Sequence, residues 1–426
     1  TANYSFDLDE IHNFSILLGQ EVQHSQKKEN FSSARYFPKE IAPRRALNNM
    51  GLGQPLRTTS SISTPMRTAS FFGQFSYNYD HKYLASFTMR ADGSTRFAPG
   101  NRWGYFPSIS GAWIISREGF LEDNPIISNL KLRAAIGLVG NDNIGDDMWR
   151  YQYKVNSTGG PGFGESNVNG EQYYVNSSDN KFPNKDIKWE TTITRNIALD
   201  LGFFNERLTI TPEFYWNTTR DLLYDSPIPS TSGYVTQTQN IGQVTNRGFE
   251  LTINGTIIQK KDFMLSANLT FGMNKSRVDK LNGNIDEFWT TSSRWKGSDD
   301  DYCMKVGSEM GLIYGYVYDG IYGFEDFDRT SSANFVAKVD ENGKQIPVNC
   351  DHLFGTAPGR PKFKNIVDHA NGREDDVNIV DEYDRTVIGN TNPDFTGGFG
   401  FNGQWKNFDF TCNFNYMVGF DVNNAT

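Results

Sequence analysis

Apolar and polar residues alternate along many segments of the chain. In the clearest example, six apolar side chains occupy alternate positions and polar side chains lie between them: Phe263, Leu265, Ala267, Leu269, Phe271 and Met273. Successive side chains point to opposite faces of a strand, so this pattern predicts a β-strand with one apolar and one polar face. The same alternation recurs in residues 71–79, 193–203, 249–257, 395–405 and 408–418.

The length of these patterns separates two kinds of β protein. Strands of soluble proteins mostly run about 5–6 residues, whereas several patterns here persist for about ten or more, the length that a membrane-spanning strand needs. Aromatic residues make up 14% of the chain, with 32 Phe, 20 Tyr and 8 Trp, and barrels place aromatic girdles at both membrane interfaces. The pattern favours a transmembrane β-barrel; the alternative is a soluble sandwich or propeller.

The connections between the predicted strands give a second test. The alternation predicts twelve spanning strands, at 2–8, 12–24, 67–80, 82–92, 103–116, 129–140, 187–204, 207–220, 243–258, 262–277, 394–405 and 408–418. The connections between these strands alternate between short turns and long loops. The longest of the short connections is 117–128, in which we expect a helical turn around 118–121. Short periplasmic turns and long extracellular loops are typical of outer-membrane barrels.

The predicted fold is therefore all-β, a transmembrane antiparallel β-barrel. An open sheet edge leaves backbone groups that hydrocarbon cannot satisfy, so such a barrel must close. Because the chain begins within a strand-like run, we expect residues 1–426 to be about twelve strands of a larger barrel, incomplete at both ends.

Composition and motifs exclude several other classes. No stretch approaches the ~18 apolar residues of a spanning helix, and a chain with 50 Asp+Glu against 41 Lys+Arg has no basic footprint for nucleic acid. The three cysteines and five histidines lack zinc-site spacing. No nucleophile elbow, HExxH or phosphate-loop motif is present, so we expect no enzyme and no required cofactor.

Several ordered segments resemble one family. They are RADGSTRFAPGNRWGYFPS at 90–108, NLKLRAAIGLVGN at 129–141, KWETT at 188–192, PIPSTSGY at 227–234, NIGQVTNRGFE at 240–250, GYVYDGIY at 315–322 and DRTVIGNTNPDFT at 384–396. Together they resemble the barrel of SusC/RagA-type TonB-dependent outer-membrane transporters.

That resemblance implies a 22-stranded barrel with an N-terminal plug, and we expect the plug to lie outside residues 1–426. It implies active, TonB-energised import of oligosaccharides or peptides in the bacterial outer membrane, with a SusD-like surface lipoprotein as lid. A siderophore or vitamin receptor without a lipoprotein is the alternative within TonB-dependent receptors, and a passive porin is a third class. The residues do not identify a substrate-binding site.

Residues 278–393 form the longest predicted connection. Between 278 and 390 there are 21 acidic and 12 basic residues, a balance equal to the formal charge of −9 of the entire chain. Loops longer than about 12–15 residues are usually functional or disordered. One interpretation is a solvated, self-repelling loop without a partner. The other is a long acidic extracellular region that docks against the lipoprotein.

Oxygen-bearing side chains gather in residues 368–381 of this region. Calcium takes 6–8 oxygen ligands within one wrapping turn, and many members of the family carry a compact DxNGDGxI loop here. This chain instead has NGREDDVNI at 371–379, with Arg in place of an acid. The candidate calcium ligands are Asp368, Asn371, Glu374, Asp376 and Asp381; a solvated acidic loop is the alternative.

Cysteines and aromatic residues supply the remaining candidates. Cys303 and Cys350 share the long region, in a compartment where disulfides persist, so either a bridge or two separate thiols fits the sequence. Cys412 falls in the lipid-facing register as a small apolar residue. Five aromatic residues in the predicted loops are candidates for stacking on sugar rings, with packing or girdle roles as the alternative: Trp149, Tyr173, Tyr174, Trp289 and Trp295.

Overall fold

The computed structural model describes most of the chain. The described residues are 1–122, 124–151, 153–155, 174–176, 181–281, 286–290, 301–330, 334–341, 343, 345–351, 353, 355–367 and 378–423. They fall into two compact units, Thr1–Gln243 and Val244–Thr426. Within the described ranges, no helix is long and apolar enough to cross a membrane.

Twelve long strands form one antiparallel sheet, in the order β1-β2-β5-β6-β7-β8-β12-β13-β16-β17-β26-β27. Their bounds are β1 Ala2–Leu8, β2 His12–Ser25, β5 Met66–Tyr79, β6 Tyr83–Ser94, β7 Trp103–Ile114, β8 Ile127–Asn141, β12 Glu190–Phe203, β13 Leu208–Arg220, β16 Gln243–Lys260, β17 Phe263–Lys280, β26 Phe395–Trp405 and β27 Phe408–Val418. Every strand predicted from the alternation is confirmed, with each end within three residues of its predicted position.

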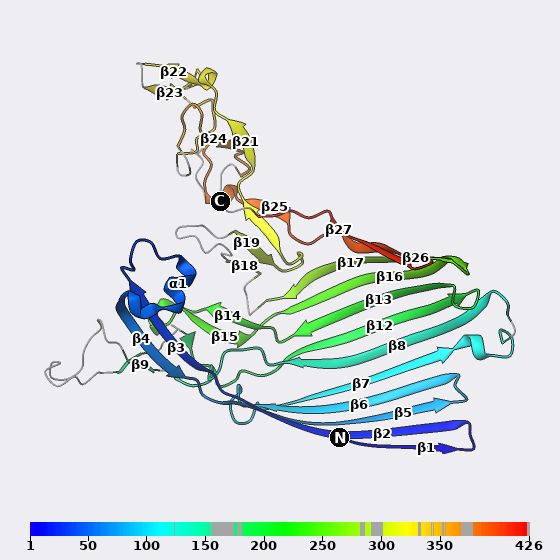
Figure 1. Ribbon diagram of the computed structural model, residues 1–426. Coiled ribbons are helices and arrows are strands. Elements are labelled where there is room, and N and C mark those ends of the chain that lie inside the picture. Colours follow the sequence, from blue (N-terminus) through cyan, green and yellow to red (C-terminus); the bar gives the residue numbers. More distant parts are fainter. Residues whose placement is uncertain are drawn as a thin grey trace. The chain divides into compact units, whose positions relative to one another are not determined.

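In the first unit the short turns lie together at one end of the strands (Figure 1). The turn between β5 and β6 closes with a hydrogen bond from Lys82 N–H to the Tyr79 carbonyl, 2.9 Å long. Its central residues, Asp80 and His81, have φ of 50° and 51°. Such a turn matches the right-handed twist of the flanking strands, and Asp and His tolerate positive φ better than most residues.

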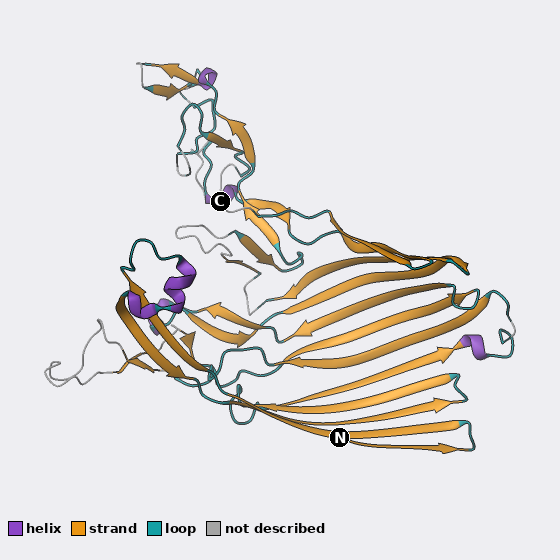
Figure 2. Ribbon diagram, viewed as in Figure 1, coloured by secondary structure: helices purple, strands orange, loops and turns teal. Residues whose placement is uncertain are grey.

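The other end of the first unit carries longer connections (Figure 1). A hairpin of β3 (Lys28–Arg35) and β4 (Gln54–Ile62) holds α1 (Pro43–Asn48) and the 3₁₀ turn Met50–Leu52 between its strands. The remaining small strands of this end are β9 Tyr153–Val155, β10 Tyr174–Asn176, β11 Lys181–Phe182, β14 Leu223–Pro227 and β15 Thr236–Asn240. Helical segments lie in connections between strands (Figure 2). At the expected turn around 118–121, the Leu121 N–H donates to the Glu118 carbonyl at 2.8 Å, directly after a 3₁₀ turn at Ile115–Arg117.

A small apolar core packs these connections against the strand ends. Phe97, Ile144 and Ile187 form a buried cluster, against which Trp189 packs. Phe106 lies against the same tryptophan, at 5.4 Å between ring centroids. A Cβ on Gly140 would overlap the Phe106 ring, so this position needs glycine for close approach rather than for backbone freedom. The motif residues Phe97, Phe106 and Trp189 therefore pack together in one small core.

The second unit contains a separate small core within its long connection. Its short strands are β18 Glu287–Thr290, β19 Tyr302–Lys305, β20 Leu312–Gly315, β21 Tyr318–Ile321, β22 Phe327–Arg329, β23 Phe335–Ala337, β24 Pro361–Phe363 and β25 Thr386–Asn390. Tyr322, Phe327, Val348, Cys350 and Val380 are packed together in its interior. The described residues of this acidic connection thus bury apolar side chains, a property that its charge pattern did not predict.

Candidate functional site

The strands of the first unit have one apolar and one polar face. Across β5, β6 and β7, Phe75, Phe87 and Ile109 are register neighbours, and they are 43%, 46% and 56% exposed. The side chains of Ser86 and its neighbour Ser110 belong to the opposite face, where their hydroxyls are 2.7 Å apart. Large apolar groups left exposed on a long-stranded sheet suit contact with lipid.

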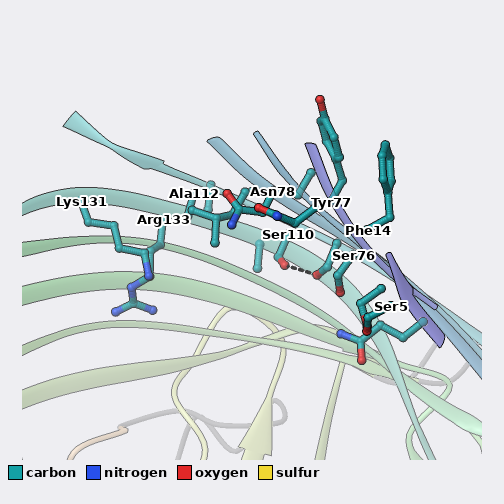
Figure 3. Close-up of a pocket in the computed structure, with 18 of the residues that line it drawn as sticks. Ser5, Phe14, Ser76, Tyr77, Asn78, Ser110, Ala112, Lys131 and Arg133 are labelled. Carbon is teal, nitrogen blue, oxygen red and sulfur yellow. Dashed lines mark hydrogen bonds between the residues drawn. The ribbon is translucent and has the colours of Figure 1, made fainter. Parts of the chain in front are cut away.

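The polar face borders a cavity of about 560 Å³. Seven strands contribute to it, and nine of its twenty lining residues are serine, asparagine or glutamine: Ser5, Asn13, Ser15, Gln74, Ser76, Asn78, Ser86, Ser110 and Asn196. Figure 3 shows Ser5, Ser76 and Ser110 on one side of the sheet and Phe14 and Tyr77 pointing away from it. The cavity therefore offers hydrogen-bonding groups beside apolar side chains such as Leu84 and Ala112.

Two acceptors of this cavity have no partner among the described residues. The Oδ1 atoms of Asn13 and Asn78 are buried and make no hydrogen bond to any part of the chain that is described. The amide nitrogen of Asn13 donates to Asp7 at 2.7 Å, and that of Asn78 contacts the His81 ring at 2.9 Å. Buried acceptors normally find a donor, so these two atoms are exceptions among the described residues.

An ion pair joins two neighbouring strands on the polar face. Arg133 on β8 makes a two-pronged contact with Asp200 on β12, with N–O distances of 2.8 and 3.0 Å. Glu213 on β13 lies 3.9 Å from the same guanidinium and accepts a hydrogen bond from Asn196 at 2.9 Å. Bidentate arginine–carboxylate pairs fix geometry as well as charge. Both acids therefore serve in a structural ion pair.

An aromatic row follows the turn end of the apolar face. Tyr83 lies 6.2 Å from Tyr79 and 6.2 Å from Trp113, between ring centroids. The Glu118 carboxylate accepts from the Tyr83 hydroxyl at 2.6 Å and from the Trp113 indole N–H at 2.9 Å. These hydrogen bonds hold the pKa of Glu118 below its usual range. Aromatic rings with one polar end are typical of a membrane interface.

One arginine interrupts the predicted apolar face of β12. Arg195 donates to the Thr218 hydroxyl at 3.4 Å, and its guanidinium lies 6.0 Å from the Trp216 ring centroid. Both partners belong to β13, so this side chain is satisfied across the strand pair.

Of the candidate calcium ligands, only Asp381 lies within the described residues; Asp368, Asn371, Glu374 and Asp376 lie outside them. Asp381 caps the 3₁₀ turn Glu382–Asp384 by accepting from the Tyr383 N–H at 2.9 Å. No group of three or more metal-ligating side chains occurs among the described residues.

A buried carboxylate beside this cap joins separate segments of the long connection. Asp384 is 1% exposed and accepts from the N–H groups of Ile366 at 2.6 Å, Val367 at 2.9 Å and Asp381 at 2.8 Å. Three backbone donors satisfy a buried carboxylate without a counter-ion. The sequence offered no signal for this residue beyond its place in the motif 384–396.

Cys303 and Cys350 are both buried free thiols. Cys303 lies on β19, where burial raises the pKa of its thiol to about 11. Cys350 is fully buried in the small core of the second unit. Of the two interpretations left open by the sequence, the structure has two separate thiols, since each is held in its own packing environment. Cys412 is exposed, on β27.

Two of the candidate stacking residues are already engaged. The Trp289 and Tyr314 rings are stacked at 3.9 Å between centroids, and the Arg150 guanidinium lies 4.1 Å from the Trp149 centroid. Tyr173 and Trp295, and the side chain of Tyr174, lie outside the described part of the chain.

Comparison with known proteins decides the family. The sequence model described as "TonB dependent receptor-like, beta-barrel" matches residues 1–425. The chain belongs to the TonB-dependent receptor-like β-barrel family. It is thus an outer-membrane β-barrel of a transporter family and not an enzyme, as the alternation and the missing catalytic motifs predicted.

The resemblance to SusC/RagA-type receptors is confirmed over the whole chain. This TonB-dependent receptor barrel is 32% identical to TonB-dependent receptor P3 of Formosa agariphila over 427 residues, 100% of this chain and 38% of that protein. It is 32% identical to TonB-dependent receptor SusC of Bacteroides thetaiotaomicron over 411 residues, 93% of this chain and 35% of that protein. The chain therefore spans well under half the length of these relatives.

Solved structures show the same fold. The RagAB peptide importer in its closed-closed state superposes with a TM-score of 0.73 at 24% identity, covering 98% of this chain and 40% of that one. A second RagAB peptide transporter structure gives a TM-score of 0.71 at 23% identity. At this identity the likeness shows the fold alone: the twelve-stranded sheet of this chain matches part of the barrel in those structures.

Proposed function

We propose that the full-length protein containing this barrel imports oligosaccharides or peptides across the outer membrane, with energy supplied through TonB and a SusD-like surface lipoprotein as lid. The observation that carries this proposal is a cavity of about 560 Å³, lined in part by serine and amide side chains, on one face of long strands whose other face is apolar. The names of the relatives add support, since SusC is a TonB-dependent receptor and RagAB a peptide importer.

The chemistry of the cavity suits a polar oligomer. Hydroxyl and amide groups such as Ser86, Ser110 and Asn196 replace hydrogen bonds that a sugar or a peptide backbone makes to water, and each such exchange has a small net free energy. Weak, repeated contacts allow a cargo to enter and to leave. The charged side chains of its wall are Asp7, Lys131 and Arg133, and Arg133 is paired with Asp200. Both signs of charge are therefore present, and the described wall does not strongly select the sign of the cargo.

The acidic connection supplies a surface for the lipoprotein. Its small core around Tyr322 and Cys350 gives part of it a fixed shape, and Asp384 joins its own turn to residues Ile366 and Val367. A shaped acidic surface suits docking better than a solvated coil does. Replacing residues 302–389 by a short turn in the full-length protein should abolish co-purification of the lipoprotein, while unchanged co-purification at normal surface levels contradicts this part of the proposal.

Uptake measurements test the transport proposal. Cells that carry or lack the full-length gene are given fluorescent oligosaccharides and peptides, with and without an uncoupler that dissipates the proton-motive force. The proposal expects uptake that needs both the gene and the proton-motive force. Native mass spectrometry of the solubilised complex identifies the partner and any bound cargo in the same preparation.

The alternatives give different outcomes in these experiments. Uptake that persists with the uncoupler indicates a passive porin. Uptake of ferric siderophores or vitamins, in a preparation without a lipoprotein, indicates the other kind of TonB-dependent receptor.

A further inference from the structure

A second, smaller cavity lies at the long-loop end of the first unit. It encloses about 210 Å³ and is lined by the residues that precede and begin β5, the turn after β6 and the connection after β8: Thr64, Pro65, Met66, Arg67, Thr95, Arg96, Arg102, Asp146, Asp147 and Arg150. None of these residues borders the larger cavity. Ligand pockets for whole small molecules run from about 300 Å³ upward, so this one fits a single group rather than an oligomer.

The charges of this small cavity do not cancel. Four arginines face two aspartates. Arg96 is paired with Asp146 at 3.4 Å and with Asp142 at 3.5 Å, and Arg150 lies 3.8 Å from Asp147. The remaining two arginines have no carboxylate partner among the described residues.

These two arginines differ from the paired ones in what their guanidinium groups contact. That of Arg102 donates to the Phe97 carbonyl at 3.3 Å. That of Arg67 makes no hydrogen bond or ion pair to any described residue, although its backbone N–H donates to the Thr95 hydroxyl at 2.9 Å. An unpaired guanidinium presents donors in a fork that matches carboxylate, sulfate and phosphate oxygens.

The walls that carry these arginines are fixed by backbone contacts. The Arg102 carbonyl accepts from the Trp189 indole at 2.9 Å and from the Ser94 N–H at 3.1 Å. The Thr95 N–H donates to the Arg67 carbonyl at 3.1 Å, so these two residues are joined twice. Phe97, in the same turn, is fully buried. A preorganised site loses less conformational entropy when it binds a ligand.

We propose that this small cavity is an anion-binding subsite at the outer mouth of the barrel, in which Arg67 and Arg102 hold a carboxylate, sulfate or phosphate group. The inference rests on the proposed import function and deepens it, since it assigns an anionic group to the cargo. Arg96 and Arg150 reinforce the positive potential while their own aspartates keep them in place.

Binding measurements on the purified, detergent-solubilised full-length protein test the subsite without any transport step. Inorganic sulfate, inorganic phosphate and acetate are titrated separately by calorimetry at low ionic strength. Arg67→Gln and Arg102→Gln should each weaken binding of the preferred anion by about tenfold or more, the usual loss for one charge-assisted hydrogen bond. The matched control is Arg57→Gln, because Arg57 is an exposed arginine on β4 outside the cavity; it should bind as the parent does.

A gain-of-affinity variant strengthens the test. Asp147 has a φ of 56°, a conformation that asparagine adopts readily, so Asp147→Asn keeps the turn and removes the charge that holds Arg150. Anion binding should become several-fold tighter. Loss of folding as an explanation is checked by the heat-modifiable mobility of every variant on a denaturing gel.

The results separate this subsite from the transport proposal. The anion that binds best identifies the group as carboxylate, sulfate or phosphate. No heat with any of the three anions, or equal binding by the parent and the Arg67→Gln and Arg102→Gln variants, overturns the subsite even where uptake is TonB-dependent. In a further outcome, anion binding depends on these arginines while uptake is unaffected by the uncoupler. That result supports the subsite and overturns only the proposal of TonB-energised transport.

Discussion

Adjacent residues on β6 give a sharp test of the two-faced sheet. Phe87 is on the apolar face between Phe75 and Ile109, near the middle of a strand that runs Tyr83–Ser94. An arginine on the lipid face of a barrel costs about 2–4 kcal/mol at the bilayer midplane. Phe87→Arg should therefore lower the equilibrium constant for folding by a factor of about 30 to 1,000. Urea titration in lipid vesicles measures the change, and the heat-modifiable fraction in outer membranes reports it in cells.

Ser86→Arg is the matched control for this substitution. Ser86 is the preceding residue, and it borders the cavity of about 560 Å³ beside Ser76 and Ser110, where a guanidinium keeps hydrogen-bonding neighbours. The control loses the Ser86–Ser110 hydrogen bond, a net effect of about 0.5–1.5 kcal/mol. The reasoning fails when Ser86→Arg destabilises the barrel as much as Phe87→Arg does, because the two faces would then have the same surroundings.

Three further predictions concern the connections. Asp384→Ala leaves three backbone N–H groups without their acceptor, at about 1–3 kcal/mol each, so amide exchange in Pro361–Phe363 and 364–367 should accelerate; unchanged exchange contradicts the buried clamp. Burial would raise the pKa of Asp225, but hydrogen bonds from Lys181 and Thr238 outweigh it and hold that pKa below its usual range. Its stabilisation of β14–β15 is therefore complete above about pH 4 and falls as the pH drops through the depressed folded pKa; proteolysis between pH 7 and pH 3 should show this loss, and Asp225→Asn should remove the pH dependence. Alkylation of the unreduced, denatured protein should modify both Cys303 and Cys350, whereas a mass two units lower, without alkylation at either, indicates a disulfide.

The spanning strands are predictable from sequence because each obeys a local rule. A strand between lipid and a polar interior needs apolar and polar side chains in strict alternation, so Phe263–Lys280 or Phe408–Val418 can be read one segment at a time. Turns between them are equally local, as Asp80 and His81 show. The partnering of strands then follows from the short connections, which leave a hairpin as the simplest arrangement.

The long connections depend on contacts between residues far apart in the chain. Trp189 donates to the Arg102 carbonyl, and Asp384 accepts from Ile366, but no period in the sequence relates either pair. The charge of the acidic region suggested a solvated loop, since a sum of charges contains no information about burial. The small core around Cys350 and its free thiol became evident only from packing.

The sequence by itself determined the strands, their two faces, the alternation of short and long connections, and the SusC/RagA-type family. Only the tertiary structure decided which polar groups meet: the Arg133–Asp200 pair across β8 and β12, the Asp384 clamp, and the arginine cavity around Arg67 and Arg102. The physical reason is the separation along the chain of the residues that decide each feature. Alternation follows from the geometry of one strand, whereas hydrogen bonds and ion pairs between connections depend on how distant segments fold back on one another.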